Sequence, residues 1–380
     1  MRRGILRWLS SLPIVAPLMA CQPSAVSTFT ELPGPDTPLG RQLAAARTDA
    51  RLPAVAGVRV TATGELLAHA FGERQASSGD LVTENDHFHL GSNSKAITAT
   101  LLAVLVERGQ LTWDRTVGES FPEWSATMPP AWRTVTLRQL LTHRAGVAPF
   151  TTPEELRDLP ADARAGTPAG QRLAFARWLL QRPPASRSGA FAYSNAGYAL
   201  AATMAERATG EPWELLLQTR LFTPLGIPAA AVRVGWPARA GAAPWGHIET
   251  GRQWTPHAPT DARIIAIPPA LAPAGDLALT MSAYGRFLQL HLRGLAGEDG
   301  LLRATTVRTL HAPDGDYAFG WAIQREGNAA IHFHEGSAGT FHAVTLLDPR
   351  RGIAVATVTN AGGDRAANAI RETADVVLRR

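Results

Sequence analysis

Residues 89–95 read His89-Leu90-Gly91-Ser92-Asn93-Ser94-Lys95, and they hold the only lysine of the 380-residue chain. The chain has 37 basic residues in all, so the other 36 are arginines. A bias towards arginine explains the loss of lysine elsewhere but not its survival at this one position. Arginine stays protonated in proteins, whereas a buried lysine can lose its proton and act as a base. We therefore interpret Ser92-x-x-Lys95 as a nucleophile and its base.

The residues that follow Ser92 predict a buried helix. Residues 96–109 are apolar nearly all round, and Gly109 is a typical stop. On a helix, positions i and i+3 lie on one face about 5–6 Å apart, which places Lys95 beside the Ser92 hydroxyl. Ser92 would also lie at the helix start, where free backbone N–H groups and the helix dipole favour an oxyanion.

Two further motifs follow in the chain. Tyr193-Ser194-Asn195 precedes a helix predicted to start near Ala196, and His334-Glu335-Gly336-Ser337 ends a predicted strand. With Ser92-x-x-Lys95, they resemble the S-x-x-K, Y-x-N and K/H-x-G motifs of serine β-lactamases and penicillin-binding proteins. The tyrosine of the second motif points to the class C β-lactamase and D,D-peptidase branch, which also holds esterases and D-aminopeptidases.

The resemblance extends from about residue 50 to residue 378. Three more segments resemble the corresponding segments of this family. They are residues 140–147 (LLTHRAGV, compared with LLTHTSGL in the branch), residues 197–227, which begin with Gly197-Tyr198 and end with PLGI, and residues 273–277 (PAGDL). The chain is identified as a member of the family on this basis.

The resemblance implies the catalytic roles. Ser92 would be the nucleophile that becomes acylated, and Lys95 and Tyr193 would share the general-base role. That role requires the pKa values of both groups, about 10.4 and 10 when unperturbed, to be lowered.

The resemblance also implies the substrate-binding groups. Asn195 would hydrogen-bond the amide side chain or carbonyl of the substrate, and the backbone N–H groups of Ser92 and Ser337 would form the oxyanion hole. His334 stands where many relatives have lysine, and Gly336 lets the substrate backbone approach its strand.

Strand-like segments at both chain ends, with helices between them, predict an α+β fold. The sheet would be antiparallel, assembled from both ends and flanked by helices, with an inserted mainly helical region, as in β-lactamases and transpeptidases. The expected strands are 56–62 and 66–72, which form a hairpin, and 317–323, 330–334, 340–347 and 352–359. The expected helices are 137–143, 169–181, 196–209, 212–221, 281–293 and 363–379. Residues 227–275 predict loop with one hairpin within 246–254.

The N-terminus predicts export. A basic start is followed by an apolar stretch to Met19 that is too short for a spanning helix, so residues 1–20 are interpreted as a signal peptide. Cys21, the only cysteine, follows a small residue as in the bacterial lipoprotein box. We expect Cys21 to carry lipid, residues 21–38 to form a tether, and residues 39–380 to form the hydrolase domain. The protein would then lie in the bacterial cell envelope, on the periplasmic side of a membrane.

Composition excludes other classes. Without Arg2, Arg3 and Arg7 of the leader, the 37 basic residues fall to 34 against 32 acidic ones, and no basic run suggests nucleic acid. The pairs His87-x-His89 and His332-x-His334 lack the third ligand of a hydrolytic zinc centre, so we expect no metal and no cofactor. No G-x-S-x-G elbow of an α/β-hydrolase occurs.

Two functions remain open. The first is a serine hydrolase that works through an acyl-enzyme on esters, on D-amino-acid peptides or amides, or weakly on β-lactams. Weak β-lactam turnover is expected because His334 replaces a permanently charged lysine and Glu335 brings a negative charge nearby. The alternative is a lipid-anchored penicillin or peptidoglycan sensor that acylates without efficient turnover. Intact motifs favour the hydrolase; the true substrate and the oligomeric state stay open.

Overall fold

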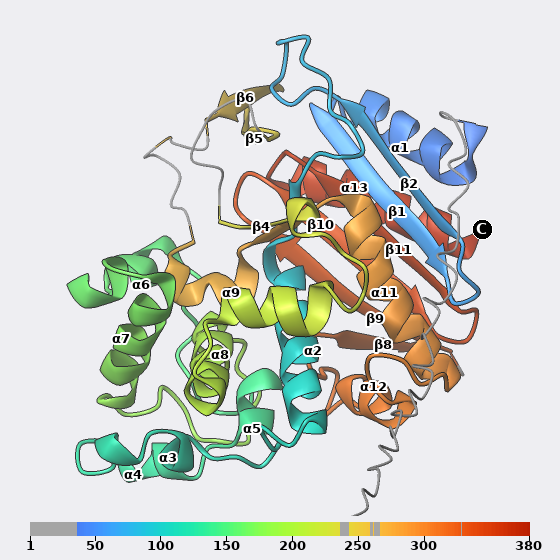
Figure 1. Cartoon of the computed structure of the whole chain (residues 1–380). Coiled ribbons are helices and arrows are strands. Elements are labelled where there is room, and N and C mark those ends of the chain that lie inside the picture. Colours follow the sequence, from blue (N-terminus) through green and yellow to red (C-terminus); the bar gives the residue numbers. More distant parts are fainter. Residues whose placement is uncertain (1–35, 236–242, 259–260, 262–266, 328) are drawn as a thin grey trace, which may run out of the picture. The chain divides into compact units, whose positions relative to one another are not determined.

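The computed structural model of the chain describes residues 36–235, 243–258, 261, 267–327 and 329–380 (Figure 1). Cys21, the signal segment 1–20 and most of the tether 21–38 lie outside the described residues. None of the helices in the described ranges has the length and apolar character that a membrane span needs.

A six-stranded antiparallel sheet is built from both ends of the chain, as the sequence predicts. Its order is β2-β1-β11-β10-β9-β8. The strands are β1 (Ala54–Thr61), β2 (Leu66–Gly72), β8 (Ala322–Glu326), β9 (Ala329–Ser337), β10 (His342–Asp348) and β11 (Ile353–Thr359). The central strand β11 is apolar or threonine throughout and is buried along its whole length, which fits a strand covered on both faces.

Each face of the sheet has its own hydrophobic cluster. On one face, Val55, Val344 and Val355 pack with α1 (Pro38–Asp49) and α13 (Asp364–Arg379). On the other face, α11 (Met281–Ala296) packs on β1, β2 and β11, within the larger cluster that also holds α2 (Ser94–Glu107). Figure 1 shows α11 and α13 on opposite sides of the strands.

The helical region between β2 and β8 supplies the remaining elements. Its α-helices are α3 (Val117–Ser120), α4 (Pro130–Arg133), α5 (Leu137–Leu141), α6 (Pro153–Arg157), α7 (Pro168–Leu180), α8 (Asn195–Thr209), α9 (Trp213–Leu216), α10 (Ala272–Gly275) and α12 (Ala304–Leu310). Short strands β3 (Phe88–His89), β4 (Val232–Val234) and β7 (Leu277–Leu279) form a second sheet, and β5 (Gly246–Thr250) pairs with β6 (Gln253–His257). The α2 helix is buried among α8, α10, α12 and the turn after α9.

Most predicted elements are confirmed, but some differ. The segment 227–275, expected to be loop with a hairpin within 246–254, also contains β4 and α10, and its hairpin extends to His257. Three other elements differ in their boundaries. The strand expected at 317–323 begins only at Ala322, because residues 317–320 turn and Gly320, at φ +83°, packs directly on the backbone of α2. The helix expected at 137–143 ends at Leu141, since His143 has φ +60°. The helix expected at 212–221 is a short α9 followed by a π-helical turn, Leu217–Phe222.

Candidate active site

Ser92 and Lys95 meet at the start of α2. Ser92 lies in a 3₁₀ turn, Gly91–Asn93, that leads directly into the helix. The Lys95 Nζ lies 3.1 Å from Ser92 Oγ, 2.7 Å from Asn195 Oδ1 and 2.7 Å from the Ala274 carbonyl oxygen. The predicted pair is therefore within hydrogen-bond reach, and Asn195 from the second motif contacts the same amine.

The surroundings of Lys95 favour a neutral amine. Lys95 is fully buried, and burial holds its pKa well below the usual value. The orientation of the Asn195 amide is fixed because its Nδ2 donates to the Phe150 carbonyl at 2.8 Å. Asn195 Oδ1 and the Ala274 carbonyl can only accept, so they take the two N–H groups of a neutral amine. The lone pair then points at the third neighbour, Ser92 Oγ, as a general base requires.

Tyr193 lies next to Lys95 and Ser92 but is not activated as expected. Its ring centroid is 4.7 Å from Lys95 Nζ. Burial raises the pKa of Tyr193 to about 12, and a hydrogen bond with Ser92 offsets this only in part. The expectation of two lowered pKa values thus holds for Lys95 and is wrong for Tyr193, because the phenol is buried without a charged neighbour strong enough to stabilise its anion.

Two glycines bring the backbone amides of Ser92 and Ser337 together. A Cβ on Gly91, which has φ +52°, would lie 2.4 Å from the Ser337 nitrogen. A Cβ on Gly336 would lie 2.0 Å from the Leu90 carbonyl and 2.7 Å from the Ser92 nitrogen. Only glycine permits this approach of β9 to the turn before α2, and it juxtaposes the two predicted oxyanion-hole amides.

A buried His–Asp pair supports the same turn. The Gly91 N–H donates to His89 Nδ1 at 3.0 Å, so the neutral ring carries its proton on Nε2 and donates to Asp276 Oδ1 at 3.0 Å. Burial raises the pKa of Asp276, opposed by the His89 hydrogen bond. Among the described residues, no group of three or more histidine, cysteine, aspartate or glutamate side chains is arranged to hold a metal ion.

His334 is inside the site but is turned away from solvent. Its Nδ1 donates to the Glu335 carbonyl at 2.7 Å, so Nε2 accepts from the Tyr317 hydroxyl at 3.1 Å. Burial, together with nearby Lys95, lowers the pKa of His334 to about 3. His334 is therefore neutral at pH 7 and does not line the cavity that contains Ser92.

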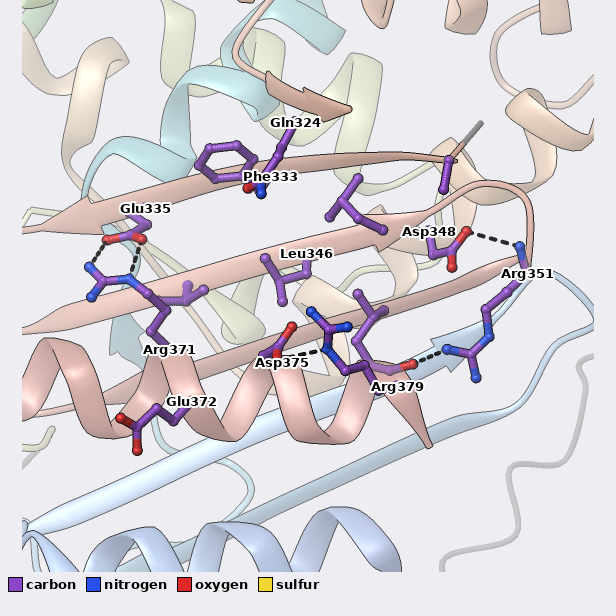
Figure 2. Close-up of a pocket in the computed structure, with 14 residues that line it drawn as sticks. Gln324, Phe333, Glu335, Leu346, Asp348, Arg351, Arg371, Glu372, Asp375 and Arg379 are labelled. Carbon is purple, nitrogen blue, oxygen red and sulfur yellow. Dashed lines mark hydrogen bonds and ion pairs between the residues drawn. The ribbon is translucent and has the colours of Figure 1, made fainter. Parts of the chain in front are cut away.

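The side chain of Glu335 points to the opposite face of the sheet, towards α13. Figure 2 shows it in a separate groove, where both carboxylate oxygens accept from Arg371 at 2.7 Å. Hydrogen bonds from Arg371 and His342 lower the pKa of Glu335 to about 2. The negative charge expected beside His334 is thus directed away from the active site, because successive residues of a strand face opposite sides.

The cavity over Ser92 has a volume of about 630 Å³ and is mainly apolar. Ser92 and Asn195 line it, and residues 337–340 form one wall. The apolar lining residues include Phe150, Leu156, Ile248, Ile267 and Leu271. Arg157 is the one ionisable side chain among the described residues that line this cavity.

Several residues of the site were not predicted from their own sequence positions. Tyr317 binds His334, Tyr198 donates to the Leu141 carbonyl at 2.8 Å, and the ring of His143 lies 4.4 Å from that of Tyr193. The Ala274 carbonyl accepts from Lys95. Because it is a backbone group, the residue type at position 274 does not reveal this contact. In the sequence, residues 140–147 and 273–277 are segments that resemble the family, and that resemblance is the signal that points to His143 and Ala274.

Comparison with known proteins decides the family. The β-lactamase family model matches residues 40–378, which is most of the chain. The chain belongs to the β-lactamase family. Penicillin-binding protein 4 of Amycolatopsis lactamdurans is 28% identical over 339 residues, which cover 84% of this chain and 83% of the relative. As a member of this family, the protein is a serine hydrolase.

Comparison with solved structures confirms the predicted fold. The D-amino acid amidase of Ochrobactrum anthropi SV3, solved with L-phenylalanine amide, matches with a TM-score of 0.70 and 22% identity, covering 90% of this chain and 98% of the amidase. The D-alanine carboxypeptidase AmpC of Burkholderia cenocepacia matches with a TM-score of 0.69 and 20% identity, covering 90% and 97%. At these identities the likeness establishes the fold and leaves the substrate open.

Proposed function

We propose that this protein hydrolyses esters, or peptides and amides of D-amino acids, through an acyl-enzyme on Ser92. The observation that carries this proposal is the position of the Lys95 amine. It is fully buried, and its hydrogen-bond partners among the described residues are Asn195 Oδ1, the Ala274 carbonyl and Ser92 Oγ, none of which is acidic.

In the proposed cycle, Ser92 Oγ attacks the substrate carbonyl while its proton passes to the neutral amine of Lys95. The oxyanion is stabilised by the backbone N–H groups of Ser92 and Ser337. The leaving group takes the phenol proton of Tyr193, which a pKa of about 12 keeps in place until it is needed. The proton held by Lys95 then restores the phenol. Water then attacks the acyl-enzyme and gives one proton to Lys95. Lys95 passes this proton to Ser92 Oγ as the bond between Ser92 and the acyl group breaks and the acid product leaves.

The choice of substrate rests on charge and on the cavity lining. A neutral His334 offers no fixed positive charge for the carboxylate of a β-lactam, and the apolar walls suit an acyl group or a side chain of moderate size. Two of the similar solved structures are named as a D-amino acid amidase and a D-alanine carboxypeptidase, and these names indicate D-amino-acid substrates for those two proteins. We expect kcat/KM for p-nitrophenyl esters or D-alanyl peptides to exceed that for nitrocefin, measured side by side.

Intact-mass analysis with a fluorophosphonate tests the nucleophile. The Ser92 oxygen would bond to phosphorus, fluoride would leave, and one adduct should map to the peptide that contains Ser92. The Ser92→Ala variant should remain unlabelled, and an adduct that persists in it would refute the assignment. Stoichiometric labelling by substrates without turnover would instead favour a sensor.

We also propose a lipid anchor on Cys21, which would tether the enzyme to the periplasmic side of a bacterial membrane. The support is the sequence of residues 1–21 alone: a basic start, an apolar run, and cysteine after a small residue. Two or more acyl chains give stable attachment where a single chain is marginal. Membrane fractionation of wild type and Cys21→Ser tests this, and a Cys21→Ser protein that stays fully membrane-bound would contradict it.

A further inference from the structure

Tyr193 lies in a segment that secondary structure does not hold in place. Residues 191–194 have no regular structure and lead directly into α8. The phenol must nevertheless remain against Ser92 and Lys95, because a displacement of about 1 Å in such a site can cost 10²-fold in rate. The contacts that hold this segment therefore bear on catalysis.

His143 provides two of these contacts, one on each side of Tyr193. The backbone N–H of Ala192 donates to the His143 carbonyl at 2.7 Å, and the backbone N–H of Ser194 donates to His143 Nδ1 at 3.1 Å. The His143 ring also packs against the Tyr193 ring at a centroid distance of 4.4 Å. One residue thus holds the main chain before and after the phenol and contacts the phenol ring itself.

The backbone of His143 is strained to make this possible. At φ +60° it occupies the left-handed region, where a non-glycine residue is uncommon and is most often asparagine, aspartate or histidine. The chain turns there directly after α5, so that both the carbonyl and the ring of His143 face residues 192–194. Such conformations cost of order 1–3 kcal/mol and concentrate at functional sites.

The ring nitrogens add a second cost. Because Nδ1 accepts from an amide, the neutral ring carries its proton on Nε2. That atom is buried and has no hydrogen-bond partner among the described residues. Burial, followed by the nearby Lys95 and His334, holds the pKa of His143 well below its usual value, so the ring stays neutral. A leucine would avoid the unpaired nitrogen but would leave the Ser194 amide without its acceptor.

We propose that His143 is a positioning residue for Tyr193, which holds the phenol against Ser92 through the main chain on both sides. It does not contact the reacting atoms and is not a catalytic residue. This inference rests on the proposed function of Ser92 and deepens it. It says that the position of the proton donor, Tyr193, is set by His143, a residue about fifty positions earlier in the chain.

A double-mutant cycle with Tyr193 tests this role. The rate of fluorophosphonate labelling of Ser92 is measured in wild type, His143→Leu, Tyr193→Phe and the double variant. We expect His143→Leu to slow labelling about 10- to 100-fold, and to have less than about 3-fold further effect in the Tyr193→Phe background, because residues that act as a unit are not additive. If His143→Leu does not fold, His143→Gly, which tolerates the positive φ and lacks the acceptor, replaces it.

Rescue provides a second readout that a merely structural role would not give. His143→Asn keeps an acceptor at the position of Nδ1 and tolerates the left-handed backbone, so its labelling rate should lie within about 3-fold of wild type. His69→Leu is the matched control: His69 is also a buried histidine, bonded to Thr37 Oγ1 at 3.0 Å on the opposite face of the sheet, and its loss should not change the rate.

The outcomes separate this inference from the proposed function. Equal factors for His143→Leu in both backgrounds, or an Asn variant as slow as the Leu variant, would overturn the positioning role. A wild-type protein that gives no adduct at Ser92 would overturn the proposed function, and this inference with it.

Discussion

Two groups of buried histidines meet on β9 and differ in how their ring nitrogens are paired. The core chain consists of His291, His311 and His332. The site cluster consists of His143 and His334 with three tyrosines, Tyr193, Tyr198 and Tyr317. His332 and His334 are two positions apart on one strand and therefore face the same side of the sheet. Comparing the two groups shows what the neutral histidine rings contribute to the core and what they contribute to the active site.

The core chain satisfies its own hydrogen bonds. The Thr100 hydroxyl donates to the Ala96 carbonyl, so it must accept from His291 Nε2 at 3.1 Å. His291 Nδ1 then accepts from His311 Nε2 at 2.9 Å, and His311 Nδ1 accepts from His332 Nδ1 at 2.7 Å. Both nitrogens of the two innermost rings are paired, so the chain stabilises the core in its neutral form.

The site cluster is less well satisfied, and the difference is informative. Within the described part of the chain, His143 Nε2 has no hydrogen-bond partner, and an unpaired buried donor costs about 1–3 kcal/mol. Natural cores avoid this cost where only packing matters, as the core chain does. We infer that the site cluster accepts it because its neutral rings hold Tyr193 and keep positive charge away from Lys95.

The largest expected effect follows from replacing the base within these neutral surroundings. Lys95→Arg should slow the labelling of Ser92 by about 10²- to 10⁴-fold, because arginine keeps its proton and cannot accept one from the serine. Arg172→Lys is the matched control: Arg172 is also fully buried, but it is paired with Glu206 and Glu214 at 2.7 Å. That variant should lose stability and keep its labelling rate. A Lys95→Arg protein within a few-fold of wild type would move the base elsewhere.

The core chain should make the protein sensitive to acid. Burial lowers the pKa of His291 to about 3 and that of His332 to about 4, and it holds the pKa of His311 well below normal. The folded state therefore binds fewer protons than the unfolded state below about pH 6.5. Stability is present above that pH and is lost as pH falls towards the folded values, by about 1.4 kcal/mol per pH unit for each histidine.

Urea unfolding between pH 5.5 and 4.5 measures this slope. His311→Leu should reduce the loss of unfolding free energy by about 1.4 kcal/mol per pH unit relative to wild type, since one proton-binding site is removed. Thr100→Val is the control, because it removes the final acceptor of the chain and keeps all three histidines. It should lower stability at every pH without changing the slope. An unchanged slope in His311→Leu would show that the chain does not resist protonation.

The sequence predicted the parts of this site that depend on short spacing. Ser92 and Lys95 are one helical turn apart, so their contact follows from helix geometry, and the order of the three motifs indicated the fold. The contacts of Tyr317 with His334 and of His143 with Tyr193 join residues far apart in the chain, and no local pattern encodes them. The raised pKa of Tyr193 was missed for the same reason, because it depends on burial by distant elements. The end of the helix at Leu141 was missed because only tertiary contacts stabilise His143 at positive φ.

The smallest expected effect concerns substrate charge. Because His334 is neutral, charge recognition in the cavity falls to Arg157, whose side chain is 63% exposed. Its ion pair among the described residues is with the exposed Glu154 at 3.2 Å. An ion pair between exposed side chains is worth about 0.2–1 kcal/mol, so an ionic contact of Arg157 with the substrate would change kcat/KM by up to about 5-fold. Arg157→Gln should lower kcat/KM for a p-nitrophenyl hemisuccinate relative to the neutral butyrate by up to about 5-fold. Arg177→Gln changes the same charge on the exposed surface of α7, outside the cavity lining, and should leave that ratio unchanged. Equal ratios in Arg157→Gln and wild type would show that the arginine does not meet the substrate, and the preference would then rest on the apolar walls alone.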